Sequence, residues 1–291
     1  MTDRGALSGR VCVITGGSRG IGAQIAEWMA EAGADVALCG RDGDAAARTA
    51  ARLSDSHGGR VMGDSCDVGQ PDSVAEWVQD IDERLGRIDI AVANAAVFGP
   101  VGPLDAVDLS AWLETVAVDV GGVASLAHSV LPVMHRNGFG RLVALSGGGV
   151  GGPRPLARAS AYVTSKAAVC ALVEVLALEL AETDVTVNAI APGAVPTGFM
   201  RGALDAGPDL AGDELFAAAR DSTPADLDGL RSLFSYLVSD ESSWVNGRVL
   251  SARWDSMRTL ERDRSLIEAG SRLRLRRVDG DLYGELKGDS S

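Results

Sequence analysis

The sequence is poor in aromatic residues and has no long uninterrupted apolar run. Aromatic side chains make up 4% of the 291 residues, whereas glycine occurs 36 times, a balance that suits helices packed tightly on a sheet better than an aromatic-rich sandwich. No stretch of about 18 or more consecutive apolar residues occurs, which argues against a membrane span. The polar start, residues 1–10, shows no secretory signal. We therefore expect a cytoplasmic protein that does not enter a membrane.

Cysteine is also scarce, and its spacing excludes two common uses. The chain has four cysteines, with no Cys-x-x-Cys pair and no histidine cluster near them. Disulfide frameworks and zinc sites need paired or closely spaced ligands. We therefore expect no metal and four free thiols in a reducing compartment: Cys12, Cys39, Cys66 and Cys170.

Basic residues are in deficit. The chain has 27 Lys and Arg against 40 Asp and Glu, a formal net charge of −13. A net negative field opposes attraction to nucleic acid and to anionic membranes. The exception is a basic cluster near the end, which includes Arg272, Arg274, Arg276 and Arg277. We expect a small-molecule partner and no nucleic acid.

Short β-branched segments alternate with longer helical patterns along most of the chain. This alternation is typical of repeated βαβ units and a parallel sheet. It predicts one α/β domain over residues 1–255, with helices on both faces of a seven-stranded parallel sheet. The predicted strands are 11–15, 35–39, 61–66, 88–93, 141–146, 185–190 and 248–251. The predicted helices are 21–31, 45–53, 73–85, 111–135 and 161–182.

Two segments fall outside this pattern. Residues 196–228 are rich in Gly, Pro, Asp and Ala, with a helix expected at 213–220. Long insertions of this kind are usually functional lids or mobile loops, and we expect a substrate lid here. Residues 256–291 form a C-terminal extension whose end we expect to be disordered. Within it, residues 273–278 alternate apolar and basic side chains, which favours an edge strand or an arm packed on a neighbouring subunit, with a nucleic-acid arm or a loose tail as alternatives.

A glycine-rich run, Thr15 to Gly22, follows the first strand and opens the first helix. Glycine permits a tight turn and close approach of a pyrophosphate, which the N–H groups at the helix start can hold. This context predicts a dinucleotide site, with contacts from Gly16, Ser18, Arg19, Gly20, Ile21 and Gly22.

The end of the second strand distinguishes between the two nicotinamide cofactors. An NAD site places a carboxylate there for the ribose 2′-hydroxyl, but this chain has Gly40 and Arg41. With Arg19 as a second contact, two guanidinium groups suit a 2′-phosphate. The neighbouring Asp42 weakens this argument slightly. We expect NADP(H) to be preferred over NAD(H).

Tyr162 and Lys166 stand four residues apart at the start of a predicted helix. This spacing puts the phenol and the ammonium on one helix face. A nearby cation favours the phenolate and so lowers the pKa of a tyrosine toward a value useful for proton transfer.

Taken together, these motifs resemble those of the short-chain dehydrogenase/reductase (SDR) family. The resemblance covers residues 7–251 and includes Tyr-x-x-x-Lys at Tyr162 and Lys166. It implies a single Rossmann-like doubly wound domain in a homodimer or homotetramer. The resemblance implies further that Tyr162 is the acid/base and that Lys166 binds the nicotinamide ribose and lowers the pKa of Tyr162. It also implies further cofactor contacts from Asp67 and Val68, from Asn94 and Ala95, and from Pro192, Gly193, Val195 and Thr197.

The chain departs from the family pattern at several positions. Gly147 stands where the family has a catalytic serine, so Ser146 or Ser160 is a candidate to hold the substrate oxygen. Asp119 stands where the family has an asparagine, and an ionised aspartate cannot donate a hydrogen bond, which puts the usual proton relay in doubt. Ala96 replaces the glycine of the family's Asn-Ala-Gly motif. The glycines from Gly147 onward also suggest room for a bulky substrate.

These observations predict an NADP-dependent oxidoreductase that reduces a ketone or oxidises a secondary alcohol, with Tyr162 as acid/base. Two alternatives stay open: a redox-neutral dehydratase or epimerase on the same scaffold, and a catalytically weak NADP-binding sensor. The acidic side chains of residues 196–228 mildly disfavour an anionic substrate, or they only keep a surface segment soluble. Net NADPH consumption distinguishes the first function from the other two.

Overall fold

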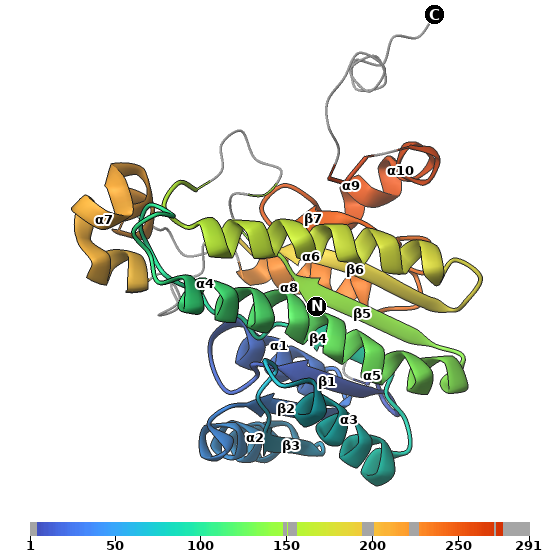
Figure 1. The fold of residues 1–291 in the computed structure, drawn as a ribbon. Coiled ribbons are helices and arrows are strands. Elements are labelled where there is room, and N and C mark those ends of the chain that lie inside the picture. The colour runs from blue at the N-terminus through green and yellow to red at the C-terminus, as the bar shows by residue number, and fades with distance from the viewer. Residues whose placement is uncertain are drawn as a thin grey trace, which may run out of the picture.

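The computed structural model describes residues 5–147, 150, 156–193, 201–220, 227–270 and 272–275. Its centre is a seven-stranded sheet, parallel throughout, in the order β3-β2-β1-β4-β5-β6-β7 (Figure 1). The order reverses between β1 and β4, as in a doubly wound Rossmann-like fold. The strands are β1 (Val11–Thr15), β2 (Asp35–Gly40), β3 (Val61–Ser65), β4 (Ile90–Ala93), β5 (Gly140–Leu145), β6 (Val185–Ala191) and β7 (Val249–Ser251).

Alternate residues of the central strands enter two different cores. In β1, Cys12 and Ile14 join one apolar cluster, while Val11 and Val13 join the other. Side chains alternate between the faces of a strand, so an apolar side chain at every position buries both faces. This is why β1, β4 and β5 have nearly continuous apolar sequences.

Helices cover both faces of the sheet (Figure 1). The first cluster contains buried residues of α1, α8, α9 and α10, and the second contains those of α3, α5 and α6. The helices are α1 (Gly20–Glu31), α2 (Gly43–His57), α3 (Pro71–Leu85), α4 (Leu109–Val116), the π-helical turn η1 (Ala117–Gly121), α5 (Gly122–Asn137), α6 (Ser160–Glu179), α7 (Arg201–Arg220), α8 (Leu227–Leu237), α9 (Met257–Arg262) and α10 (Arg264–Ala269).

Two helical stretches are long and apolar enough to cross a membrane by length and composition, Leu109–Asn137 and Ser160–Glu179. In the structure both lie on the sheet and contribute side chains such as Leu126 and Val169 to the second core. Burial against the sheet accounts for part of their apolar sequence, since 44% of the most apolar window of each stretch is buried.

The structure refines several predicted elements. The single helix predicted at 111–135 is instead α4, η1 and α5 in succession, and the π-turn contains Asp119. The helix predicted at 213–220 is the last part of α7, whose helical backbone is interrupted at Gly207 and Gly212, both at positive φ. The helix α8 was not predicted.

The C-terminal extension begins with two short helices and then returns to the edge of the sheet. Arg248, which precedes β7 and is 4% exposed, donates hydrogen bonds to the carbonyls of Ile267, Gly270 and Arg272. The Val249 N–H donates to the Leu273 carbonyl at 2.7 Å. This part of the extension therefore packs on its own chain. The rest of the predicted basic arm, and the end expected to be disordered, lie in residues 276–291, outside the described residues.

Candidate active site

The conformation of the glycine-rich turn between β1 and α1 depends on its glycines and on hydrogen bonds from Asn94. Gly16 has φ +64°, and a Cβ on it would lie 2.9 Å from the Ala95 Cα. The Asn94 side-chain amide donates to the carbonyls of Thr15 at 2.9 Å and Gly16 at 3.0 Å. Asn94, predicted to contact the cofactor, is therefore a support of the turn.

The start of α1, at Arg19 and Gly20, is exposed to solvent beside this turn. Arg19 is the residue before the helix, and its side chain makes no capping hydrogen bond. The first N–H groups of a helix need an outside acceptor, and Ser18, Gly20, Ile21 and Gly22 surround them. The sequence predicts that these residues hold the pyrophosphate of a dinucleotide, and an exposed helix start is the kind of site that binds such an anion.

The end of β2 lies against the same turn. A Cβ on Gly40 would come 3.0 Å from the Ser18 Oγ, so a side chain there is disfavoured. The next acidic residue, Asp42, accepts a hydrogen bond from the Ala45 N–H at 2.9 Å and caps α2. The exposed Arg19 and Arg41 flank this edge, and no ion pair between either of them and another described residue is found.

Asp67 and Val68 follow β3 and lie in the same region. The Asp67 Oδ1 accepts from the Gly69 N–H at 3.0 Å, and Val68 packs against Gly122. The Cys66 N–H donates to the Gly40 carbonyl, which ties this loop to the end of β2. Pro192 and Gly193 follow β6, whereas the predicted contacts Val195 and Thr197 lie outside the described residues.

Tyr162 and Lys166 share one face of α6 and are both buried, at 7% and 3% exposure. The Lys166 Nζ donates to the Leu145 carbonyl at 3.1 Å, at the end of β5. It lies 3.6 Å from the Asp119 Oδ2 and 5.8 Å from the Tyr162 ring centroid. The structure thus brings together three of the predicted catalytic residues.

Asp119 is fully buried on the π-turn η1. Its Oδ1 accepts a hydrogen bond from the Val97 N–H at 2.8 Å, and its Oδ2 makes only the ion pair with Lys166 within the described part of the chain. Burial raises the pKa of Asp119, while the Lys166 charge and the Val97 N–H oppose the shift. Its carboxylate and the Lys166 ammonium form one buried pair.

The pKa of Tyr162 shifts in the direction opposite to that expected from Lys166, chiefly because the phenol is buried. Burial lowers the pKa of Lys166, and Asp119 opposes that shift. Burial, and after it the Asp119 charge, raise the pKa of Tyr162 well above its ordinary value. The expectation that Lys166 lowers this pKa takes no account of a buried carboxylate beside the ammonium. A phenol with a raised pKa keeps its proton at neutral pH and is able to donate it.

Gly147 packs directly against the Tyr162 side chain. A Cβ on Gly147 would lie 1.9 Å from the Tyr162 hydroxyl oxygen and 2.7 Å from its Cζ. The phenol therefore occupies the space that a side chain at position 147 would need. The suggestion that the glycines leave room for a bulky substrate is wrong at this residue, because the tyrosine itself fills the space.

The two candidate serines point to other partners. The Ser146 Oγ lies 3.2 Å from the Cys170 Sγ and is buried. The Ser160 Oγ accepts a hydrogen bond from the Trp112 Nε1 at 3.0 Å. Both hydroxyls therefore have structural partners, and their proposed role in holding a substrate oxygen stays a prediction.

An apolar cluster surrounds the phenol, and the sequence analysis did not identify it. The Phe98 ring stacks on the Tyr162 ring with centroids 5.0 Å apart and planes 26° apart. The same cluster contains Ala203, Ala211, Leu215 and Ala219 of α7, with Phe216 packed against it. Phe98 lies 64 residues from Tyr162 in the chain, so no local sequence pattern links the two.

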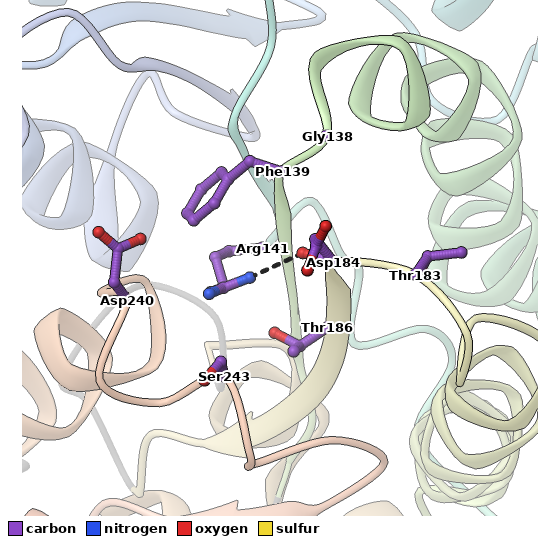
Figure 2. A pocket seen from close by; sticks show the side chains of 8 residues that line it. All are labelled: Gly138, Phe139, Arg141, Thr183, Asp184, Thr186, Asp240 and Ser243. Atoms are coloured by element: carbon purple, nitrogen blue, oxygen red, sulfur yellow. Dashed lines mark hydrogen bonds between the residues drawn. The ribbon is translucent and has the colours of Figure 1, made fainter.

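A separate cavity of about 420 Å³ lies at the edge of the sheet where β5 and β6 begin. Tyr162 and Lys166 lie near the other edge, where β5 ends. Figure 2 shows Arg141 near the middle of its lining, between Asp240 and Asp184, with Thr186 and Ser243 close to each other. The Arg141 guanidinium donates to the Asp184 carbonyl at 3.1 Å. Because ligands of doubly wound sheets bind at the carboxyl ends of the strands, we place the reactive site at Tyr162.

Comparison with known proteins gives a consistent result. A family model described as enoyl-(acyl carrier protein) reductase matches residues 16–252. A short-chain type dehydrogenase/reductase of Picea abies is 33% identical, over 84% of this chain and 91% of its own length. Among solved structures, an NAD⁺-bound xylitol dehydrogenase has a TM-score of 0.74 at 27% identity, covering 84% of this chain and 98% of its own. A metagenomic short-chain oxidoreductase in complex with NADP has a TM-score of 0.61 at 33% identity, covering 65% and 84%.

Proposed function

Because the chain belongs to the short-chain dehydrogenase/reductase family, we propose that this oxidoreductase uses NADP(H) to reduce a ketone or to oxidise a secondary alcohol, with Tyr162 as the acid/base. The observation that carries the proposal is the buried Tyr162 phenol beside Lys166, in a fold whose glycine-rich turn lies at the carboxyl edge of the same sheet. The relatives with solved structures bind NAD⁺ in one case and NADP in another.

In the reduction, Tyr162 donates its hydroxyl proton to the substrate oxygen as negative charge develops there. When bound, the reduced nicotinamide supplies the hydride to the carbonyl carbon. Lys166 and Asp119 hold the phenol in a fixed electrostatic environment, and the apolar cluster around Phe98 excludes water. In the reverse direction a Tyr162 phenolate accepts the proton of the alcohol, which requires a pH high enough to ionise it.

The preference for NADP rests on the end of β2. Gly40 leaves no carboxylate there, Asp42 is used to cap α2, and Arg19 and Arg41 flank the edge. A 2′-phosphate would gain charge-assisted hydrogen bonds from these two guanidinium groups. A ribose 2′-hydroxyl would find no acceptor of the kind that NAD sites provide.

The activity test follows NADPH consumption with ketones and compares two hydroxyl deletions. Tyr162→Phe is expected to lower turnover by about 10²–10⁴-fold, the usual contribution of a positioned acid/base. Tyr236→Phe removes the same group from α8, where it bonds Glu261 and Trp244 away from the site, and is expected to retain turnover. If Tyr162→Phe kept more than about a tenth of the activity, the assigned role would be wrong.

A second candidate is a weak or redox-neutral protein that binds NADP. The buried Asp119–Lys166 pair and the phenol packed on Gly147 favour it, since both depart from the family's active-site pattern. Product formation without net change in the cofactor would support a redox-neutral enzyme. Tight NADPH binding to a chain that turns over no substrate but binds a partner protein would support a sensor.

We also propose a cytoplasmic homodimer or homotetramer. Large apolar side chains are exposed on two helices that pack together, α4 and α6. They are Leu109, Leu113, Val175 and Leu178, with exposures of 51–70%. Exposed apolar side chains are often buried at an interface with another protein surface, and a second copy of the chain is the simplest partner.

A further inference from the structure

We propose that the substrate is an uncharged ketone or secondary alcohol whose apolar body contacts Phe98, Leu215 and Phe216. This inference rests on the proposed function and names the substrate class of the same site. It starts from the position of Tyr162, which is 7% exposed and lies inside an apolar cluster. Among the described residues, the side chains packed with Tyr162 in this cluster are apolar, and a carbonyl group that reaches the phenol meets them.

The cluster draws its members from segments far apart in the chain. Phe98 and Val101 follow β4, Leu156 and Ala159 precede α6, and the remaining members belong to α6 and to α7. Figure 1 shows α7 at the end of the molecule where α4 and α6 begin. The buried positions of α7 are Ala203, Ala211, Leu215 and Ala219, so the part of this helix that faces the phenol is apolar.

The charges near the phenol argue against an anionic substrate. The Lys166 ammonium is buried and is already shared between the Asp119 carboxylate and the Leu145 carbonyl. The helix α7 carries four acidic residues, Asp205, Asp209, Asp213 and Glu214, against two basic ones, Arg201 and Arg220, and all six are exposed. A carboxylate or phosphate on the substrate would approach past this acidic helix and then enter an apolar cluster, and burial of an unpaired charge is unfavourable.

The test uses compounds that differ in charge and little else. Methyl 4-oxocyclohexanecarboxylate and free 4-oxocyclohexanecarboxylate share the ring and the carbonyl, but only the second is an anion at neutral pH. With NADPH as cofactor, we expect kcat/KM for the ester to exceed that for the acid by about 100-fold or more, as burial of one unpaired charge implies. Turnover of the acid at a kcat/KM equal to or above that of the ester would overturn the substrate class while confirming a reductase.

Substitutions in α7 locate the effect. Leu215→Asp introduces a charge into the cluster and is expected to lower kcat/KM for the ester by about 10²-fold, with the NADPH dissociation constant unchanged. Leu204→Asp places the same charge on the same helix at an exposed position and is expected to keep the wild-type preference. Leu215→Ala remains apolar, so a smaller loss with the preference for the ester intact guards against a folding defect in Leu215→Asp.

The outcomes separate this inference from the proposed function. Tight NADPH binding with no consumption in the presence of any ketone, neutral or charged, would overturn the oxidoreductase function and the substrate class together. Turnover that survives Leu215→Asp at the wild-type rate would overturn only the assignment of α7 to the substrate site.

Discussion

At the scale of single residues, the site contains two pairs of residues in which each member depends on the other, Gly147 with Tyr162 and Asp119 with Lys166. Gly147 carries no side chain because the Tyr162 hydroxyl lies where its Cβ would be. Asp119 and Lys166 are each buried and each other's charge partner. A substitution at one member of either pair is therefore expected to change the packing or the pKa of the other member.

Gly147→Ala is expected to destabilise the fold by about 1–3 kcal/mol, because the added methyl group requires the phenol to move. Gly121→Ala is the matched control, since Gly121 is helical and a Cβ there meets no atom within 4 Å. That change is expected to stabilise the protein by about 0.4–1 kcal/mol. Urea unfolding measures both, and equal unfolding free energies for the two variants would contradict the packing described.

Asp119→Asn is expected to lower the pKa of Tyr162. The Asp119 charge raises this pKa, so its removal leaves the Lys166 ammonium to stabilise the phenolate. Alcohol oxidation, which needs the phenolate, would then reach its plateau at a lower pH, because the phenolate population at a given pH increases as the pKa falls toward that pH. Ketone reduction, which needs the phenol, would lose rate at a correspondingly lower pH.

Ultraviolet difference absorbance of the phenolate follows this titration directly, with Tyr162→Phe as the baseline for the other tyrosines. Asp105→Asn removes an exposed carboxylate and is expected to leave the titration unchanged. A phenolate titration that moves to higher pH in Asp119→Asn would contradict the electrostatic account.

At the scale of elements, the sequence predicted the strands well because each is a short apolar segment buried on both faces. The strand predicted at 11–15 coincides with β1. The helix α8 was missed although Leu230, Leu233, Phe234 and Leu237 have helical spacing, because the Gly- and Asp-rich residues before it obscured its start. The π-turn at Asp119, the Phe98 stack and the ion pair with Lys166 depend on contacts between distant segments, which no local pattern reveals.

The turn before α1 and the end of β2 form the element that selects the cofactor. The double variant Arg19→Ala and Arg41→Ala is expected to weaken NADPH binding by about 10–100-fold, the range of one or two charge-assisted hydrogen bonds. NADH binding should change little, because NADH lacks the 2′-phosphate. Arg136→Ala, which removes an exposed guanidinium at the end of α5, is the control, and dissociation constants come from nicotinamide fluorescence. Tighter binding of NADH than of NADPH by the wild-type protein would refute the cofactor preference.

At the scale of the whole molecule, the net charge of −13 opposes association with nucleic acid and anionic membranes. The β7 edge is partly covered by the chain's own extension through Arg248 and Leu273. For the proposed oligomer, we expect the exposed apolar side chains of α4 and α6 to form the interface.

The double variant Leu113→Gln and Leu178→Gln is expected to lower the oligomeric mass. Both side chains are exposed, at 56% and 70%, and the substitutions remove apolar surface from the proposed interface. Leu210→Gln, on α7 and 50% exposed, is the matched control and should leave the mass unchanged. Sedimentation velocity measures both. An unaltered mass in the double variant would place the interface elsewhere.

Transfer of the hydride can be followed directly with an isotopic label. Reduction of a neutral cyclic ketone is run with NADPH that carries deuterium at the transferring position of C4, and the alcohol product is analysed by mass spectrometry and NMR. We predict one deuterium on the carbinol carbon in the wild-type protein and in Tyr236→Phe, and little product in Tyr162→Phe. Product without deuterium, or labelled product formed at the wild-type rate by Tyr162→Phe, would contradict hydride transfer with Tyr162 as the proton donor.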